Sequence, residues 1–255
     1  MMISPDGAAP LHAVDVDGFL VARTEATFAD WLVYLDALPP AERDRRRPHV
    51  DKGGFGGALA LRDRPDGALE LRIQPATRPY VARLGEPIRI DARPRRASLD
   101  WRRLPVVGVG AEDVGAYAAW LRGTGRVPGA RLCTEAEWER AARGADGREY
   151  PHGDALAPED AAFDETYAKD PLAMGSDEVG SHPASRSPFG VDDLAGNVWE
   201  WTTSSVTVGE HVARGGSYYH SAIAARAVNR EVPEPTLRDL TVGARICADL
   251  PRSAR

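Results

Sequence analysis

The chain has 255 residues, of which 43% are hydrophobic and 27% are charged, as in an ordinary folded globular protein. Its formal net charge of -6 counts against nucleic acid as the main partner, and no apolar run approaches the ~18 residues of a membrane span. Because the N-terminus carries no signal-peptide pattern, we expect a cytoplasmic protein in which Cys133 and Cys247, able to form at most one disulfide, stay thiols.

The first hundred residues predict a strand–helix unit followed by a hairpin. Apolar alternation with a glycine break over 11–23 indicates a short strand pair, and the helical period over 24–38 ends at Pro39 and Pro40. Residues 41–56 are polar and rich in arginine and glycine, which predicts a loop. The runs ALALR and ALELRIQ, separated by DRPDG, predict a β-hairpin, and EPIRID is typical of a further strand.

The middle of the chain predicts two helices and then a long irregular region. VVGVG after Pro105 indicates an extended run, and AEDVGAYAAWL shows a helical apolar face. In RLCTEAEWERAARG, Thr134 and Glu137 form a capping box, and Gly144 ends the predicted helix. Residues 145–196 have almost no periodicity, which indicates a functional region or loops held by a bound ion.

Two short segments are candidates for function. GNVWEW places the oxygen ligands Asn197 and Glu200 beside two tryptophans, which suits Ca²⁺, although by residue chemistry alone a buried aromatic turn is the favoured interpretation. RGGSYYHSAIAARAVNRE, residues 214–231, begins with permissive glycines that can bring the backbone close to a ligand, yet it holds no cysteine and one histidine. The four histidines after residue 150 lack metal-ligand spacing and are expected to be ordinary surface or core residues.

Five motifs in order resemble the formylglycine-generating enzyme, or sulfatase-modifying factor, family. They are RLCTEAEWERAARG, YPHGD, VGSHPASRSPFGVDDLAGNVWEWT, RGGSYY and VGARICADL. DGFLVARTEATFADWLVYL is similar to the N-terminal strand and helix of that family. The resemblance implies one domain over 1–255, with residues 41–100 as a subfamily insertion. It also implies an irregular α+β fold related to the C-type lectin fold, with little regular secondary structure.

Structural calcium is a further implication of the resemblance. The Asn197 side chain, a backbone carbonyl near Val198 and the Glu200 carboxylate are expected to form one site, and Asp164 a second. The same resemblance implies a substrate groove. Its expected lining is Trp201, Ser217, Tyr218, Tyr219, His220 and Arg226.

The sequence departs from the family at the copper site. Active members bind Cu(I) through two cysteine thiolates, and soft thiolates are the ligands that Cu(I) prefers. The aligned positions here are His220 and Ala225, so copper is not expected. The iron-binding H-x-x-x-H-x-E pattern of the related sulfoxide synthases is also missing from the sequence.

We therefore expect a non-catalytic peptide-binding, ligand-binding or regulatory module. Domains of this type resemble those fused to bacterial serine/threonine kinases, which makes such a kinase a possible partner. One alternative is a copper or non-heme iron oxidoreductase with other ligands, such as His220 and Tyr219. A calcium-dependent, lectin-like sugar-binding role is the third.

Overall fold

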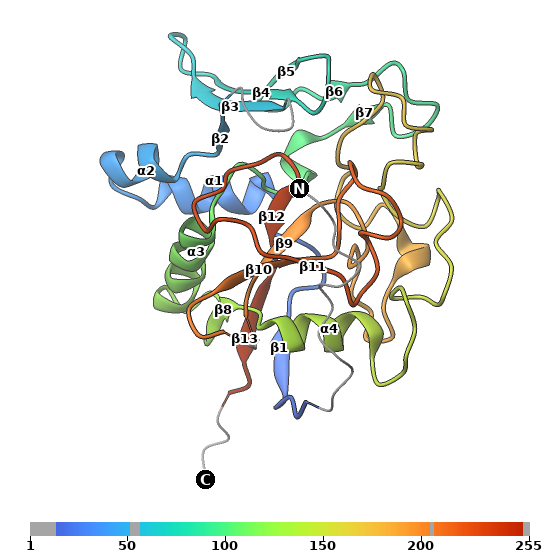
Figure 1. Cartoon of the computed structure of the whole chain (residues 1–255). Helices are drawn as coiled ribbons and strands as arrows, with labels where there is room; N and C mark the ends of the chain where they lie inside the picture. Colours follow the sequence, from blue (N-terminus) through green and yellow to red (C-terminus); the bar gives the residue numbers. More distant parts are fainter. Residues whose placement is uncertain (1–13, 52–56, 205–206, 252–255) are drawn as a thin grey trace.

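A computed structural model describes residues 14–51, 57–204 and 207–251 (Figure 1). The α-helices are α1 (Phe28–Asp36), α2 (Pro40–Arg46), α3 (Ala111–Gly123) and α4 (Glu135–Arg143), and the 3-10 helices are η1 (Trp101–Arg103) and η2 (Pro183–Ser185). The first strands are β1 (Phe19–Val21), β2 (His49–Val50), β3 (Ala58–Asp63), β4 (Leu69–Gln74), β5 (Tyr80–Arg83), β6 (Ile88–Arg89) and β7 (Ser98–Leu99). The later strands are β8 (Ala130–Leu132), β9 (Trp199–Thr203), β10 (His211–Arg214), β11 (Arg230–Glu231), β12 (Val242–Ala244) and β13 (Ile246–Asp249).

The strands form small separate sheets with the helices packed around them. Their orders are β1-β13-β8, β11-β10-β9-β12, β2-β3-β4-β5 and β6-β7, and only the β12–β9 pair is parallel among these ladders. Figure 1 shows the β2–β5 sheet at the top, β9, β10 and β12 in the centre, and α4 with β1, β8 and β13 below. The expectation of an α+β fold with little regular secondary structure is confirmed.

Helix α1 forms where the helical period predicted it. The Thr27 hydroxyl accepts a hydrogen bond from the Asp30 backbone N–H, and the Asp30 carboxylate accepts from the Thr27 N–H, so a capping box starts the helix. Its apolar stripe buries Trp31 against Tyr34 and, from α3, Tyr117, with ring centroids about 5 Å apart. The same aromatic cluster anchors α3, whose inward face was also predicted correctly.

The predicted hairpin is present, and its register follows its alternation. Leu59 pairs with Ile73 and Leu61 with Leu71, and all four side chains are buried on one face. The EPIRID segment contributes β6. The loop expected at 41–56 is wrong for its first part, because α2 and β2 lie there; residues 52–56 lie outside the described chain.

The helix predicted after RLCT is α4, with both of its sequence signals in place. The Glu137 carboxylate accepts from the Thr134 backbone N–H, and the Thr134 hydroxyl accepts from the Glu137 N–H. Gly144 follows with φ of 70°, a value that glycine adopts at little cost. Trp138 is fully buried and points from α4 toward β9 and β10.

The irregular region 145–196 contains only η2 as a regular helix or strand. A buried ion pair helps to hold it, since the Arg93 Nη1 lies 2.8 Å from the Asp177 Oδ1 and neither side chain is exposed. The Tyr167 hydroxyl and the His182 ring also contact this carboxylate. Although burial opposes ionisation, these contacts and the Arg93 charge lower the pKa of Asp177. Arg93 lies outside the loop, so the loop is fixed by the segment preceding η1.

Membrane insertion through a helix has no support in the described ranges, since each helix there is too short or too polar to cross a bilayer.

Candidate functional site

The glycine pair at the end of β10 permits the chain to fold back on itself. Gly215 and Gly216 have φ of 103° and 77°, in the region that favours glycine. A Cβ on Gly216 would lie 2.8 Å from the Ala225 Cα, and one on Gly215 would lie 3.1 Å from the Trp138 ring. Side chains at these positions would clash, so the close packing of this turn explains both glycines of the RGGS motif.

Directly after this turn, a serine, a histidine and a tryptophan form a hydrogen-bonded set. The Ser217 Oγ lies 2.7 Å from the His220 Nδ1, and the Trp199 Nε1 donates to the same nitrogen at 3.3 Å. An indole N–H can only donate, so the His220 Nδ1 is the unprotonated acceptor and its Nε2 carries the proton. Burial lowers the pKa of His220, which favours this neutral form.

Half of the expected groove lining lies in the interior. Trp201 has no exposed surface and donates its indole N–H to the Val109 carbonyl, while Ser217 and Tyr218 are 1% and 4% exposed. These three therefore cannot form the wall of an open groove. Tyr219 is 37% exposed, and His220 is half-buried.

Arg226 is the last of the expected groove residues and also reaches the surface. Its guanidinium Nε lies 3.1 Å from the Glu149 carboxylate, and both side chains are partly exposed. The surface part of the loop is thus made by Tyr219, His220 and Arg226.

Asn197 joins three segments that are distant in sequence. Its backbone N–H donates to the Ala162 carbonyl, its Oδ1 accepts from the Asp177 N–H, and its Nδ2 donates to the Glu25 Oε1 at 3.0 Å. Its φ of 57° is one that asparagine tolerates better than most residues. The following residue, Val198, is fully buried. Asn197 therefore has a structural role that uses both ends of its amide.

Glu200 forms a buried ion pair with Arg245. The Arg245 Nη2 lies 2.6 Å from the Glu200 Oε1, Arg245 Nε contacts both carboxylate oxygens, and Trp138 donates to the Oε2. Both charged side chains are at most 1% exposed. Burial raises the pKa of Glu200, and the Arg245 charge opposes that rise.

The expected calcium ligands are engaged by protein partners in this arrangement. The Asn197 Oδ1 and both Glu200 oxygens already accept hydrogen bonds, and the Asp164 Oδ2 lies 3.2 Å from the Lys169 Nζ. In the described ranges, no group of three or more His, Cys, Asp or Glu side chains is placed to hold a metal ion. These side chains as placed suit their protein donors better than Ca²⁺, and structural calcium stays a prediction.

A second buried acid beside this ion pair was missed at the sequence level. Glu25 is 1% exposed and lies within the electrostatic reach of Asp193, Glu200 and Arg245. Burial raises the pKa of Glu25 well above its usual value, and the Asp193 charge raises it further. One arginine thus lies among three buried carboxyl groups. Glu25 lies two residues before the Thr27 cap of α1, inside the segment predicted as helical, and that pattern gives no sign of a buried carboxyl group.

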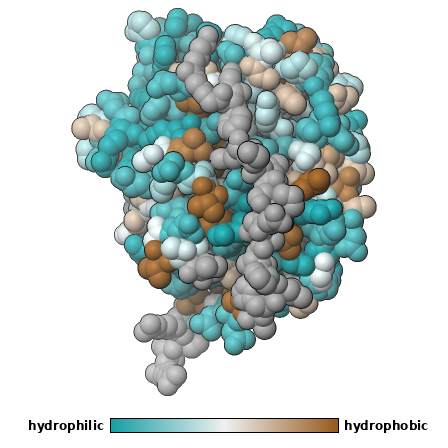
Figure 2. All heavy atoms as spheres, viewed as in Figure 1, coloured by the Kyte–Doolittle hydropathy of each residue, from teal (hydrophilic) through white to brown (hydrophobic). Residues whose placement is uncertain are grey.

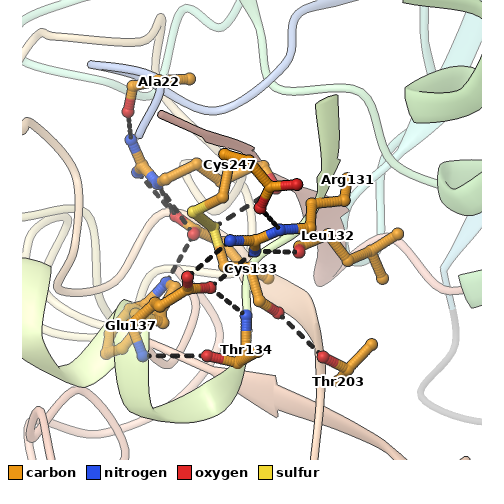
Figure 3. The surroundings of a disulfide bond; sticks show 12 residues. Ala22, Arg131, Leu132, Cys133, Thr134, Glu137, Thr203 and Cys247 are labelled. Atoms are coloured by element: carbon orange, nitrogen blue, oxygen red, sulfur yellow. Dashed lines mark hydrogen bonds and ion pairs between the residues drawn. A yellow bond between two sulfur atoms is a disulfide. The ribbon is translucent and has the colours of Figure 1, made fainter. Parts of the chain in front are cut away.

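The two cysteines form a disulfide, so the expectation of free thiols is wrong for this structure (Figure 3). Their Cα atoms are 4.8 Å apart, and the bond joins the end of β8 to β13, next to the Thr134 cap of α4. Both residues are at most 1% exposed. At the loop itself, Ala225 offers no ligand atom beside His220. The residues present therefore do not fit a copper–thiolate centre.

The comparisons with known proteins agree on one family. A family model described as "Sulfatase-modifying factor enzyme 1-like domain" matches residues 1–250. The chain is 32% identical over 226 residues to a formylglycine-generating enzyme of Mycobacterium tuberculosis, covering 77% of this chain and 67% of that protein. It is 30% identical to a mouse protein named inactive C-alpha-formylglycine-generating enzyme 2, covering 85% and 69%. It is also 30% identical to a hercynine oxygenase of Mycolicibacterium thermoresistibile, and this match covers 97% of this chain but 54% of that protein.

Solved structures show the same fold at lower identity. CarF superposes with a TM-score of 0.57 at 20% identity, covering 91% of this chain and 87% of CarF. PvdO from Pseudomonas aeruginosa superposes with a TM-score of 0.60 at 22% identity, covering 98% and 90%. The expected formylglycine-generating-enzyme fold is confirmed by these likenesses, which at such identities bear on the fold alone.

Proposed function

The chain belongs to the sulfatase-modifying factor enzyme 1-like family, and from that premise we propose that it is a non-catalytic member that binds a peptide or small molecule. The binding surface is the exposed part of the 214–231 loop. The proposal rests on where the two cysteine sulfur atoms lie. Copper chemistry of the kind that the resemblance implies needs two thiolates in this loop, whereas the two cysteine sulfurs of this chain are bonded to each other between β8 and β13.

The relative named inactive C-alpha-formylglycine-generating enzyme 2 supports this proposal, because it gives the family a member whose name denotes lost activity. A scaffold of this kind can be kept for binding after its metal ligands are replaced. The expectation of a bacterial serine/threonine kinase as a partner rests on the resemblance and is part of the proposal.

The loop surface offers side chains that suit ligand recognition. Tyr219 is 37% exposed and Ile223 is 55% exposed, and the Arg226 guanidinium is partly exposed beside Glu149. Tyrosine and arginine are common anchors at binding surfaces, and the Nε2–H of His220 supplies a donor of fixed tautomer. Figure 2 shows hydrophobic residues on one face as separate spots on a hydrophilic surface rather than one continuous patch. We infer recognition by a few polar and aromatic contacts.

An oxidoreductase with other ligands is the rival, because two kinds of oxidising enzyme stand among the relatives. It would use His220 and Tyr219 as ligands. That role would require His220 to give up either its contacts at Nδ1 or its proton at Nε2. The hydrogen-bonded state of His220 therefore favours the binding module.

Elemental analysis followed by peptide-library selection tests the proposal. Protein prepared without a metal-affinity tag is expected to hold no stoichiometric copper or iron and to retain specific peptides. Tyr219→Ala should weaken the binding of the retained peptides at least tenfold. Val81→Ala, at an exposed position of β5, serves as the matched control and should leave the affinity for these peptides unchanged.

Two results would overturn the binding module. One is copper or iron near one equivalent that is lost in His220→Ala, together with oxidation of a substrate. The other is calcium-dependent retention on sugars with no peptide selected, which would support the lectin-like role.

A further inference from the structure

The outer face of the β2–β5 sheet carries two arginines next to each other. In the β3–β4 ladder Ala60 pairs with Arg72, and Arg62 pairs with Glu70, so Arg62 and Arg72 are diagonal neighbours on one face. Both side chains are exposed. Two like charges on neighbouring positions of one sheet face repel each other, so an anion that contacts both guanidinium groups would bind favourably there.

Neither arginine has a partner within the described ranges. Arg62 and Arg72 make no ion pair and no side-chain hydrogen bond there. Glu70, which faces Arg62 across the ladder, lies 3.7 Å from the Arg64 Nε instead. The only other carboxylate at the end of β3, Asp63, is held 2.6 Å from the Arg47 Nη2. Two guanidinium groups therefore remain available to a ligand.

A hollow of about 450 Å³ lies beside these arginines. Small residues on the outer face, Ala58 and Ala60, form its floor, because Leu59 and Leu61 point their side chains into the core. His49, paired with Ala60, completes the row formed with Arg72.

The other charged or titratable side chains around the hollow are Asp44, Arg47, His49 and Asp51. The His49 Nδ1 lies 3.1 Å from the Arg47 carbonyl oxygen and 3.2 Å from the Arg238 Nη1, so contacts within the protein already engage this ring nitrogen. Asp44 and Asp51 also line the hollow, but neither forms an ion pair with Arg62 or Arg72. Figure 1 shows this sheet at the top of the molecule, well separated in the view from β10 and β11 and their loop.

We propose that Arg62 and Arg72 form an anion site that binds the phosphate group of a small phosphorylated molecule. A guanidinium binds two oxygens of one anion in its fork geometry. A single carboxylate, with two oxygens and one charge, is satisfied by one arginine. A phosphate has enough oxygens and up to two charges, so it can neutralise both arginines together, and the hollow leaves room for the rest of the molecule.

Titration of the full chain with pyrophosphate, and separately with inorganic phosphate, tests the site. Ionic strength is held constant with chloride, and binding is followed by calorimetry and by the NMR signals of the arginine Nε–H groups. We expect saturable binding that shifts two arginine signals. Arg62→Gln with Arg72→Gln should weaken it at least tenfold, whereas Arg89→Gln, an exposed arginine of β6, should leave it unchanged.

Each alternative result overturns the assignment. Absence of saturable binding by either phosphate probe would rule out the proposed anion site. Equal binding by the double variant, with an unchanged melting temperature, would place it elsewhere. Equal affinity for acetate at the same ionic strength would exclude a phosphate-selective site. The proposal is independent of the function of the 214–231 loop.

Discussion

Replacing Cys133 and Cys247 together with alanine removes the covalent link between β8 and β13. Alanine is the suitable replacement because both positions are at most 1% exposed and a serine hydroxyl there would be buried. The disulfide acts mainly on the unfolded chain, which it closes into a loop. Because the two cysteines are 114 residues apart, the chain-entropy relation assigns ~5 kcal/mol to the closure.

That amount is large beside the ~5–15 kcal/mol that separates most folded domains from their unfolded state. We expect the double variant to fold with a free energy of unfolding lower by about 3–5 kcal/mol, since measured losses usually fall at or below the entropic value. Urea unfolding followed by the fluorescence of the buried tryptophans measures the difference. The m-value should rise, because a chain without the cross-link exposes more surface on unfolding.

Reduction of the unaltered protein is the control, because it removes the bond without changing the sequence. The reduced protein and the double variant should lose the same stability to within about 1 kcal/mol. Two free thiols in the native protein by mass spectrometry under non-reducing conditions would refute the reasoning. So would a loss below about 1 kcal/mol in both samples. The cytoplasmic localisation stays a prediction, and the thiol state in the source cell bears on it because such bonds persist mainly in oxidising compartments.

Three further changes test the site. Asn197→Ala removes two buried hydrogen bonds and should lower the free energy of unfolding by about 2–4 kcal/mol, so an unchanged urea midpoint would contradict this. If calcium binds at Asn197, a chelator should lower the urea midpoint of the unaltered protein and leave that of the variant unchanged. The folded pKa of Glu25 lies above its ordinary 4.5, so its contribution to stability is complete below that pH and is lost as pH rises through the folded pKa. Glu25→Gln should flatten this decline in a pH series of urea melts, and an identical slope would count against it. The folded pKa of His220 lies below 6.5, so stability is lost as pH falls from above 6.5 through the folded pKa. His220→Asn, whose amide oxygen can accept in place of Nδ1, should reduce that acid loss, and an acid midpoint that does not move would refute the assigned protonation state.

Local signals determined much of the fold from the sequence alone. The capping box of Thr134 and Glu137 and the stop at Gly144 involve residues within one or two helical turns, so their outcome hardly depends on the rest of the chain. The same holds for the hairpin of β3 and β4, where alternation and a short turn fix the register. The ordered motifs determined the family.

The site was decided by contacts between residues far apart in the chain. Glu200 became an ion-pair partner rather than a metal ligand because folding brings Arg245 within 2.6 Å of it. Trp201 became a core residue because the Val109 carbonyl accepts its N–H in the interior. The cysteines became a disulfide because β8 pairs with β13, which places their Cα atoms 4.8 Å apart. Side-chain chemistry in a sequence limits what a residue can do, but the partner that decides its role is supplied by tertiary packing, over separations that no local pattern encodes.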